Sequence, residues 1–137
     1  MEPKTLLVDT GAWYALADRS DRHHAKAVAV YPELLRKRRY LTTTNLIIAE
    51  TFTLIRRAIG HAAAISFLSS IAASPRVMKI YSDRTLEETA EEILRKYQDQ
   101  DFSFTDAVSF AAMQRGRIAE AFSFDRHFKT AGFSLIP

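Results

Sequence analysis

Apolar positions along the chain fall into two patterns, short continuous runs and longer stretches with helical spacing. The run TLLVD at residues 5–9 is followed by a turn-like Thr-Gly pair, and this pattern predicts a buried strand. Similar runs predict strands at residues 40–43, 77–81 and 120–124. The closing FSLIP predicts a last strand at the edge of the sheet, which ends at Pro137.

Between these runs, apolar residues recur with the spacing of one helix face. The predicted helices begin at Ala12, at the candidate caps Asp21, Asn45, Asp83 and Ser103, and at residue 61, with a short helical turn at residues 125–132. Gly60 and Gly116 are typical helix ends. Strands that alternate with helices predict a three-layer α/β/α sandwich with a mostly parallel central sheet.

Length and composition narrow the class of protein. The 137 residues fit one domain, residues 1–137, and 47% hydrophobic and 26% charged residues are ordinary for a globular protein. The chain has no cysteine, which excludes disulfides, thiolate metal sites and a cysteine nucleophile. No apolar run reaches the roughly 20 residues that span a bilayer, and MEPKTLL does not have the pattern of a secretory signal. We therefore expect a cytoplasmic protein that does not bind membranes.

The net charge of +3 and the pI of about 9.3 are mildly basic. The basic residues cluster at residues 36–39, at Arg56 and Arg57, and at Arg115 and Arg117. Such clusters suit a phosphate backbone, although solvated helix ends explain each cluster equally well.

Asp9 has two chemical interpretations. The letters DTGA at residues 9–12 match the catalytic motif of an aspartic protease, and they also place a carboxylate at the end of a buried strand. An aspartic protease is built from strands and glycine-rich hairpins, whereas this chain has four glycines and is predicted to be mostly helical. The strand-end carboxylate is therefore favoured, with Gly11 supplying backbone freedom at the turn.

Three further acids stand at comparable places. Asp125 follows the strand at residues 120–124, and Asp106 follows Ser103 by three residues, as in a capping box. Glu50 shares a helix face with Ile47 and Leu54, where a carboxylate is costly unless it is paired or holds a metal. Simple helix capping explains each aspartate taken alone. A buried ion pair with an arginine, or a position on a turn at the margin of the core, explains Glu50 equally well.

Taken together, the four acids indicate a cation site. Ligands collect at the carboxyl ends of parallel strands, and clustered carboxylates raise one another's pKa unless a cation neutralises them. Oxygen ligands suit Mg²⁺ or Mn²⁺, which can activate a water for attack on phosphorus. With basic clusters elsewhere, a nucleic-acid phosphodiester is the expected substrate.

Four segments also carry a resemblance to a known family. LLVDTGAWYAL, NLIIAETFTLIRRAIG, DFSFTDAVSFAAMQRGRIAEAFSFDRHF and GFSLIP resemble, in this order, the PIN-domain family and most closely its VapC-like ribonuclease toxins. The resemblance implies a Mg²⁺- or Mn²⁺-dependent endoribonuclease that leaves a 5′-phosphate, with Asp9, Glu50, Asp106 and Asp125 as the catalytic and metal-binding residues. It also implies a homodimer and a cognate antitoxin whose C-terminal segment occupies a groove near the site.

Chemistry suggests a role for each residue of this site. Asp9 and Asp106 are the best candidates for direct metal contact, and Glu50 for the metal or its water. Asp125 would complete the cluster or a second, weaker metal site. The candidates for supporting hydrogen bonds are Thr10, Asn45, Ser103 and Thr105. Asp101 is assigned to a polar loop, His127 to the turn after Asp125, His23 and His24 to the surface, and Trp13 and the phenylalanines of residues 102–110 to the core.

Two alternatives from other classes remain open. One is a non-catalytic RNA-binding or scaffold module that keeps the acids for folding, and the other is a structure-specific DNA nuclease. Four mutually repelling acids are not needed in a scaffold, and the chain is short for a DNA-threading arch. RNA cleavage by metal-activated water is therefore the leading hypothesis.

Overall fold

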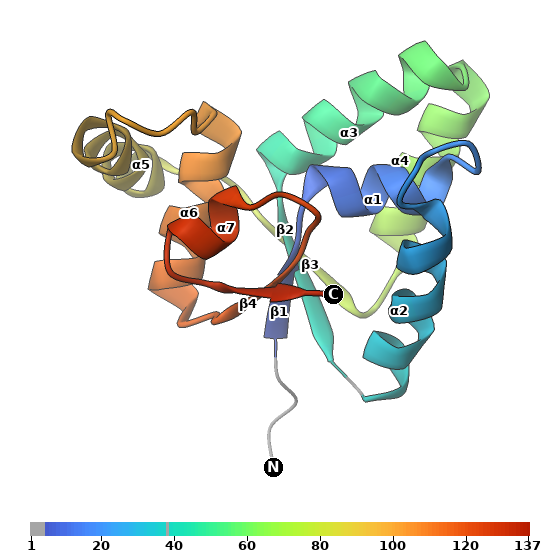
Figure 1. Cartoon of the computed structure of the whole chain (residues 1–137). Helices are drawn as coiled ribbons and strands as arrows, with labels where there is room; N and C mark the ends of the chain where they lie inside the picture. The colour runs from blue at the N-terminus through green and yellow to red at the C-terminus, as the bar shows by residue number, and fades with distance from the viewer. Residues whose placement is uncertain (1–4, 38) are drawn as a thin grey trace.

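The described residues form a five-stranded parallel sheet in the order β3-β2-β1-β4-β5 (Figure 1). The computed structural model describes residues 5–37 and 39–137. Every pair of neighbouring strands is parallel, so the sheet is wholly and not just mostly parallel. The strands are β1 (Thr5–Val8), β2 (Tyr40–Thr44), β3 (Val77–Ile80), β4 (Glu120–Phe122) and β5 (Ser134–Ile136).

Helices cover both faces of this sheet and confirm the predicted three layers. In Figure 1, α1 to α4 lie on one side of the strands, and α5 to α7 lie on the other. The helices are α1 (Thr10–Ala17), α2 (His24–Arg36), α3 (Asn45–Ala58), α4 (His61–Ala73), α5 (Arg84–Lys96), α6 (Phe104–Gly116) and α7 (His127–Thr130). Within residues 5–37 and 39–137, no helix is long and apolar enough to cross a membrane.

The chain reverses its direction across the sheet between β1 and β4. It runs from β1 outward to β2 and β3, then returns through α5 and α6 to pair β4 with the free side of β1. The register places Leu7 beside Ala121, and the N–H of Asp9 donates to the carbonyl of Phe122 at 3.1 Å. In open parallel sheets such a reversal point opens a crevice at the carboxyl ends of the strands, where ligands bind.

The core explains why these segments fold as they do. Leu6, Leu7 and Val8 of β1 have no exposed surface, as expected for a central strand covered on both faces. Residues 106–113 of α6 are also buried in succession, because α6 packs between α5 and the sheet. A helix that is buried all round shows no single apolar face, which fits its near-continuous run of apolar and small residues.

The helix starts confirm some predicted caps and correct others. Ser103 and Asp106 form the predicted capping box, and Asp83 caps α5 through the N–H of Leu86. Asn45 was predicted as the cap of α3, but the hydroxyl of Thr44 accepts the N–H of Ile47 at 3.1 Å instead. The Asn45 side chain is used elsewhere, because its Oδ1 accepts the N–H of Ser82 at 2.8 Å.

Two further details differ from the predictions. Asp21 does not cap α2, which begins after His23; the Asp21 carboxylate accepts the N–H of His23 in the preceding turn. Gly11 lies within α1, which already begins at Thr10, so no special backbone conformation requires a glycine there. Gly60, by contrast, has φ of 128° between α3 and α4, a conformation that favours glycine.

Candidate metal-binding active site

Asp9 lies at the carboxyl end of β1, where the sheet reverses its order. It stands before the first residue of α1, yet its carboxylate makes none of the usual side-chain capping bonds to that helix. Instead Oδ2 accepts a hydrogen bond of 3.0 Å from the hydroxyl of Ser123. Burial raises the pKa of Asp9 to about 7, and the nearby charges of Asp106 and Asp125 add to this rise. Capping therefore does not explain this carboxylate.

Asp106 reaches the same region from the first turn of α6. Its Oδ2 accepts the N–H of Ser103 at 3.0 Å and lies 3.0 Å from Nδ1 of His127. Among the described residues, Oδ1 has no hydrogen-bond partner. Capping accounts for one oxygen of this carboxylate and leaves the other free for a ligand.

Asp125 and His127 come from the loop after β4. The N–H of His127 donates to Asp125 Oδ1 at 2.9 Å, which is the turn contact predicted for this histidine. Its ring has a further role, because Nδ1 lies 3.0 Å from Asp106 and 3.3 Å from Asp125 Oδ2. One ligand atom from each of these three residues lies within 4.8 Å of the other two, an arrangement that could hold a metal ion.

Glu50 differs from its prediction. The sequence placed it on the buried face of its helix, but Glu50 is exposed on α3, and Leu54 next to it is 39% exposed. No arginine of the described residues forms an ion pair with Glu50, so the predicted buried ion pair is wrong, whereas the exposed position agrees with the other alternative, a glutamate at the margin of the core. The helix buries Ile47, Thr51 and Ile55, whereas Glu50 is exposed.

A cavity of about 720 Å³ brings these residues together. It contains all four predicted acids, together with Asp101, which the sequence had assigned to a polar loop. Asp9 and Glu50 line it outside the compact group of Asp106, Asp125 and His127. The other lining residues are Thr10, Gly11, Arg22, His23, Ser103, Leu54, Phe124 and Arg126. We refer to this space as the acidic cavity.

The four candidates for supporting hydrogen bonds separate into two pairs. Thr10 and Ser103 line the acidic cavity, and Oγ1 of Thr10 is buried without a hydrogen-bond partner in the described chain. Asn45 binds the backbone of Ser82, as described above, and Thr105 accepts the hydroxyl of Ser109 through its carbonyl. Neither Asn45 nor Thr105 lines the cavity.

Sequence reasoning missed Ser123. It is 1% exposed, donates to Asp9 and accepts the N–H of Asp125 at 3.0 Å. A hydroxyl residue two positions before the strand-end aspartate, in FSFD, is the signal that could have drawn attention to it. Only the pairing of β1 with β4 makes that signal meaningful, because the bond to Asp9 spans 114 positions.

The predicted basic clusters lie away from the acidic cavity and are partly neutralised. Arg36 pairs with Glu33 at 3.2 Å, Arg39 with Glu120 at 3.2 Å, and Arg115 with Asp83 at 2.9 Å. Arg38, which belongs to the cluster at residues 36–39, lies outside the described residues. The arginines that line the cavity are Arg22 and Arg126.

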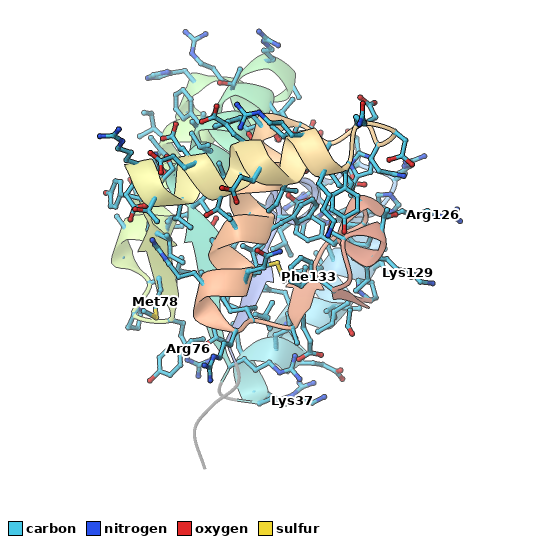
Figure 2. The ribbon with its side chains drawn as sticks, turned by 90° about the vertical axis from the view of Figure 1, so that its left-hand side faces the viewer. Lys37, Arg76, Met78, Arg126, Lys129 and Phe133 are labelled. Atoms are coloured by element: carbon cyan, nitrogen blue, oxygen red, sulfur yellow. The ribbon has the colours of Figure 1, made fainter. Side chains whose placement is uncertain are left out.

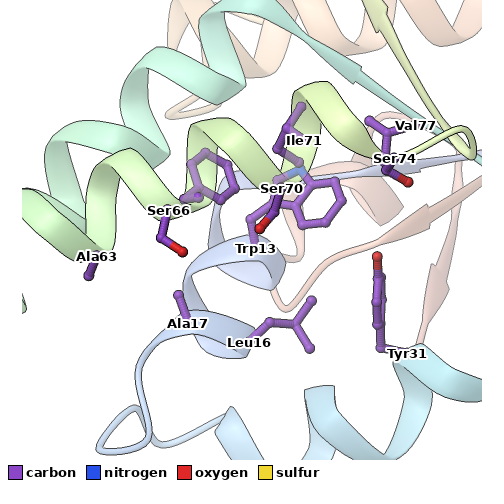
Figure 3. Close-up of a pocket in the computed structure, with 11 residues that line it drawn as sticks. Trp13, Leu16, Ala17, Tyr31, Ala63, Ser66, Ser70, Ile71, Ser74 and Val77 are labelled. Atoms are coloured by element: carbon purple, nitrogen blue, oxygen red, sulfur yellow. The ribbon is translucent and has the colours of Figure 1, made fainter.

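A second cavity of about 410 Å³ lies beside the first and is mostly apolar. Figure 3 shows Trp13, Leu16 and Tyr31 facing the helix that carries Ser66 and Ser70 across this space. Burial raises the pKa of Tyr31 above its ordinary value. The helix α1 belongs to both cavities, with Thr10 and Gly11 at one and Trp13 and Leu16 at the other.

The acidic cavity fits a divalent cation. Its donors are carboxylate oxygens, which suit Mg²⁺ or Mn²⁺, and the buried Thr10 hydroxyl is a neutral oxygen still without a partner. Burial is the main cause of the raised pKa of Asp9, and the charges of Asp106 and Asp125 add to it; a bound cation would offset that repulsion.

The protein is a parallel α/β sandwich, and carboxylates line a crevice at the point where its sheet reverses. This combination is typical of α/β proteins that bind a cation at the carboxyl ends of their strands. Comparison with known proteins is more specific: the PIN domain family model matches residues 6–134. The chain belongs to the PIN-domain family.

Individual relatives agree with this assignment. The chain is 36% identical over 128 residues to the 23S rRNA-specific endonuclease VapC20 of two Mycobacterium tuberculosis strains, covering 93% of this chain and 95% of the relative. The crystal structure of M. tuberculosis VapC20, described as a sarcin–ricin loop cleaving toxin, matches with a TM-score of 0.86 and 35% identity, covering 93% of this chain and 95% of that one. VapBC2 of Rickettsia felis, bound to a promoter DNA fragment, matches with a TM-score of 0.69 at 12% identity over 96% of this chain and 97% of that one, which shows a common fold.

Proposed function

We propose that this protein is a Mg²⁺- or Mn²⁺-dependent endoribonuclease and the toxin of a type II toxin–antitoxin pair, with residues 1–137 acting as one PIN-like nuclease domain. The observation that carries the proposal is the convergence of Asp9, Asp106 and Asp125 on one cavity at the reversal point of the sheet. The identity to VapC20 supports RNA as the substrate and makes 23S rRNA the first target to test.

In this proposal Asp9 and Asp106 contact the cation, and Asp125 completes the cluster. The cation would supply an activated water and offset the negative charge that develops at phosphorus. Ser123 fixes Oδ2 of Asp9, and the N–H of Ser103 together with the His127 ring fixes Oδ2 of Asp106. These bonds orient one oxygen of each carboxylate and leave the other oxygen available. Hydrogen-bond partners commonly orient metal-binding carboxylates in this way.

Glu50 is proposed to act on the water or to hold the cation. Its exposed side chain lines the acidic cavity from α3. A carboxylate without a protein partner can accept a hydrogen bond from the attacking water. Attack of the water on phosphorus would break the bond to the 3′ oxygen, so that one product ends in a 3′-hydroxyl and the other carries a 5′-phosphate.

The partners belong to the same proposal. A cognate antitoxin would hold the enzyme inactive, and the mostly apolar cavity beside α1 offers a groove for its C-terminal segment. A segment seated there would contact the helix that also borders the acidic cavity. A cytoplasmic homodimer is the proposed state of the enzyme.

Cleavage of labelled RNA tests this function. Purified protein should cut a hairpin that carries the sarcin–ricin loop of 23S rRNA when Mn²⁺ or Mg²⁺ is added, and chelation should stop the reaction. The DNA hairpin of the same sequence should remain intact. Cleavage that Asp9→Asn performs at the wild-type rate, or that persists without divalent cations, would contradict the proposal.

A further inference from the structure

An aromatic pair stands at the acidic cavity. The rings of His23 and Phe124 are stacked, with centroids 4.2 Å apart and planes inclined by 3°. Phe124 rests edge-on against Phe122 of the buried core at 6.0 Å, so the core fixes its position. His23 precedes α2, and Phe124 follows β4; both are half-buried and both line the cavity.

Two arginines flank this pair. Arg22 donates from Nε to Nε2 of His23 at 3.1 Å, and Arg126 follows the cavity residue Asp125. Both side chains are exposed, and Figure 2 shows Arg126 beside α7. Within residues 5–37 and 39–137, neither guanidinium forms an ion pair with a carboxylate, although five acids line the same cavity.

The two arginines bear on how a negatively charged strand can enter the acidic cavity. A nucleic-acid strand that enters a cavity lined by five carboxylates is repelled before its phosphate can reach the cation. Cationic groups at the entrance offset that repulsion, and an aromatic face binds a base whatever its identity. The described aromatic contacts of His23 involve Phe124 alone, so no other aromatic ring covers the second face of the histidine.

We propose that Arg22, His23, Phe124 and Arg126 form an RNA-binding rim, in which the arginines bind phosphates of the strand and the His23–Phe124 pair stacks a nucleobase. The inference rests on the proposed ribonuclease function. It deepens that function by assigning positioning residues for the substrate. An unpaired base of a loop presents its face to such a platform, whereas a base inside a duplex does not. The rim therefore selects single-stranded or looped RNA.

The phosphate contacts are tested by the salt dependence of cleavage. The substrate is the labelled sarcin–ricin hairpin at a fixed, saturating Mn²⁺ concentration, and KM and kcat are measured over a series of KCl concentrations. Arg22→Ala and Arg126→Ala should each raise KM, leave kcat unchanged, and reduce the slope of log KM against log [KCl] by about 0.7. Arg22→Lys and Arg126→Lys should restore the slope, since lysine keeps the charge.

Arg36→Ala is the matched control for the arginines. Arg36 ends α2, whereas Arg22 precedes the start of that helix, and Arg36 does not line the acidic cavity. Figure 2 shows the neighbouring Lys37 at the bottom of the molecule, below Arg126. Its loss should leave KM and the salt slope unchanged. Equal slopes in the wild type, Arg22→Ala and Arg126→Ala would overturn the phosphate assignment.

The stacking contact is tested by His23→Ala and His23→Tyr. The alanine variant should raise KM by about five- to a hundred-fold without changing the salt slope, because it removes a stacking surface and no phosphate contact. Tyrosine keeps an aromatic face and should restore most of the affinity. His61→Ala, at the start of α4 and outside the cavity, should have no effect. If His23→Tyr is as weak as His23→Ala, the stacking role is wrong.

Failure of the rim and failure of the proposed function give different results. If the wild type cleaves RNA and the rim variants match it in KM and in salt slope, the rim is wrong and the ribonuclease function stands. If the wild type cleaves no RNA in Mn²⁺, the proposed function fails and the rim loses its substrate. A variant that lowers kcat at constant KM also contradicts a positioning role.

Discussion

The hydroxyl of Ser123 connects two carboxylate segments of the acidic cavity. It donates a hydrogen bond of 3.0 Å to Oδ2 of Asp9 and accepts one of 3.0 Å from the N–H of Asp125. Ser123 follows β4, and Asp9 follows the neighbouring parallel strand β1, so the bond crosses the point where the sheet reverses. The hydroxyl thereby links the carboxylate of Asp9 to the backbone at Asp125.

Ser123→Ala should weaken cation binding. The substitution removes the donor that stabilises the charged form of Asp9, so the pKa of this carboxyl should rise further above about 7. Loss of one such hydrogen bond costs on the order of 1–2 kcal/mol, which corresponds to a roughly ten-fold weaker Mn²⁺ affinity. Titration calorimetry with Mn²⁺ measures the change directly.

Ser109→Ala is the matched control for that experiment. Ser109 is equally buried, and its hydroxyl donates to the carbonyl of Thr105 at 2.9 Å, away from the acidic cavity. The Ser109→Ala variant should have a lower free energy of unfolding than the wild type and the same Mn²⁺ affinity. Equal Mn²⁺ affinities for Ser123→Ala and the wild type would contradict the role assigned to Ser123.

Asp9 should make the metal-free protein less stable as the pH rises. Its folded pKa of about 7 lies above the ordinary value of 3.8, so the folded state binds this proton more tightly than the unfolded state does. The contribution of Asp9 to stability is therefore fully present below about pH 4 and is lost as the pH rises through about 7. At about pH 8, Asp9→Asn should be more stable than the wild type by at most about 4 kcal/mol, and this gain should disappear below about pH 4.

Thermal unfolding of both proteins across this pH range, with and without Mn²⁺, provides the measurement. Mn²⁺ should raise the midpoint of the wild type and leave that of Asp9→Asn unchanged, since a ligand stabilises only the state that binds it. A gain in stability that is the same at every pH would show that Asp9 is not the group responsible.

Asp106 has a structural and a chemical role, and a substitution can separate them. Asp106→Asn keeps an oxygen that accepts the N–H of Ser103, so the capping box should survive and stability should change by less than about 1 kcal/mol. The lost charge should abolish Mn²⁺ binding and reduce RNA cleavage by at least about a hundred-fold. Unfolding midpoints and cleavage rates test the two halves of this prediction.

Asp83→Asn provides the comparison. Asp83 also precedes a helix and caps it through the N–H of Leu86, but it pairs with Arg115 outside the acidic cavity. This variant should bind Mn²⁺ and cleave RNA like the wild type. Cleavage that falls equally in both variants would mean that helix capping, and not metal binding, explains the effect of Asp106.

Glu50→Gln should affect chemistry but not stability. Glu50 is exposed and has no ion-pair partner among the described residues, so the unfolding midpoint should stay within about 1 °C of the wild type. Its loss should lower kcat for RNA cleavage by about ten- to a hundred-fold. Glu88→Gln, exposed on α5, is the control. An unchanged kcat in Glu50→Gln would remove Glu50 from the mechanism.

The sequence predicted the fold well, because short buried strands and marked helix ends are local signals. The run TLLVD formed β1, and Ser103 and Asp106 formed the predicted capping box. The predicted cap of α3 was wrong because two polar residues compete at the start of this helix. Thr44 caps α3, and the side chain of Asn45 accepts the backbone N–H of Ser82. Such a choice depends on a neighbouring loop that is 37 positions away.

Of the residues that line the acidic cavity, the sequence had pointed to the four acids, Thr10 and Ser103 as site candidates. Glu50 lines the cavity as expected, but it is exposed, because the spacing of residues on a helix does not say which face the sheet covers. Ser123 and the His23–Phe124 pair depend on contacts between segments that the sequence does not place side by side. His127 was assigned to a turn, yet its ring also bridges two carboxylates.

Diffraction at the manganese absorption edge tests the central claim most directly. In crystals soaked in Mn²⁺, the account predicts an anomalous peak in the acidic cavity, at coordination distance from a carboxylate oxygen of Asp9 and one of Asp106. The peak should be missing from crystals of Asp106→Asn treated in the same way. A cavity that stays empty at saturating Mn²⁺, or a peak that contacts neither Asp9 nor Asp106, would contradict the proposed active site.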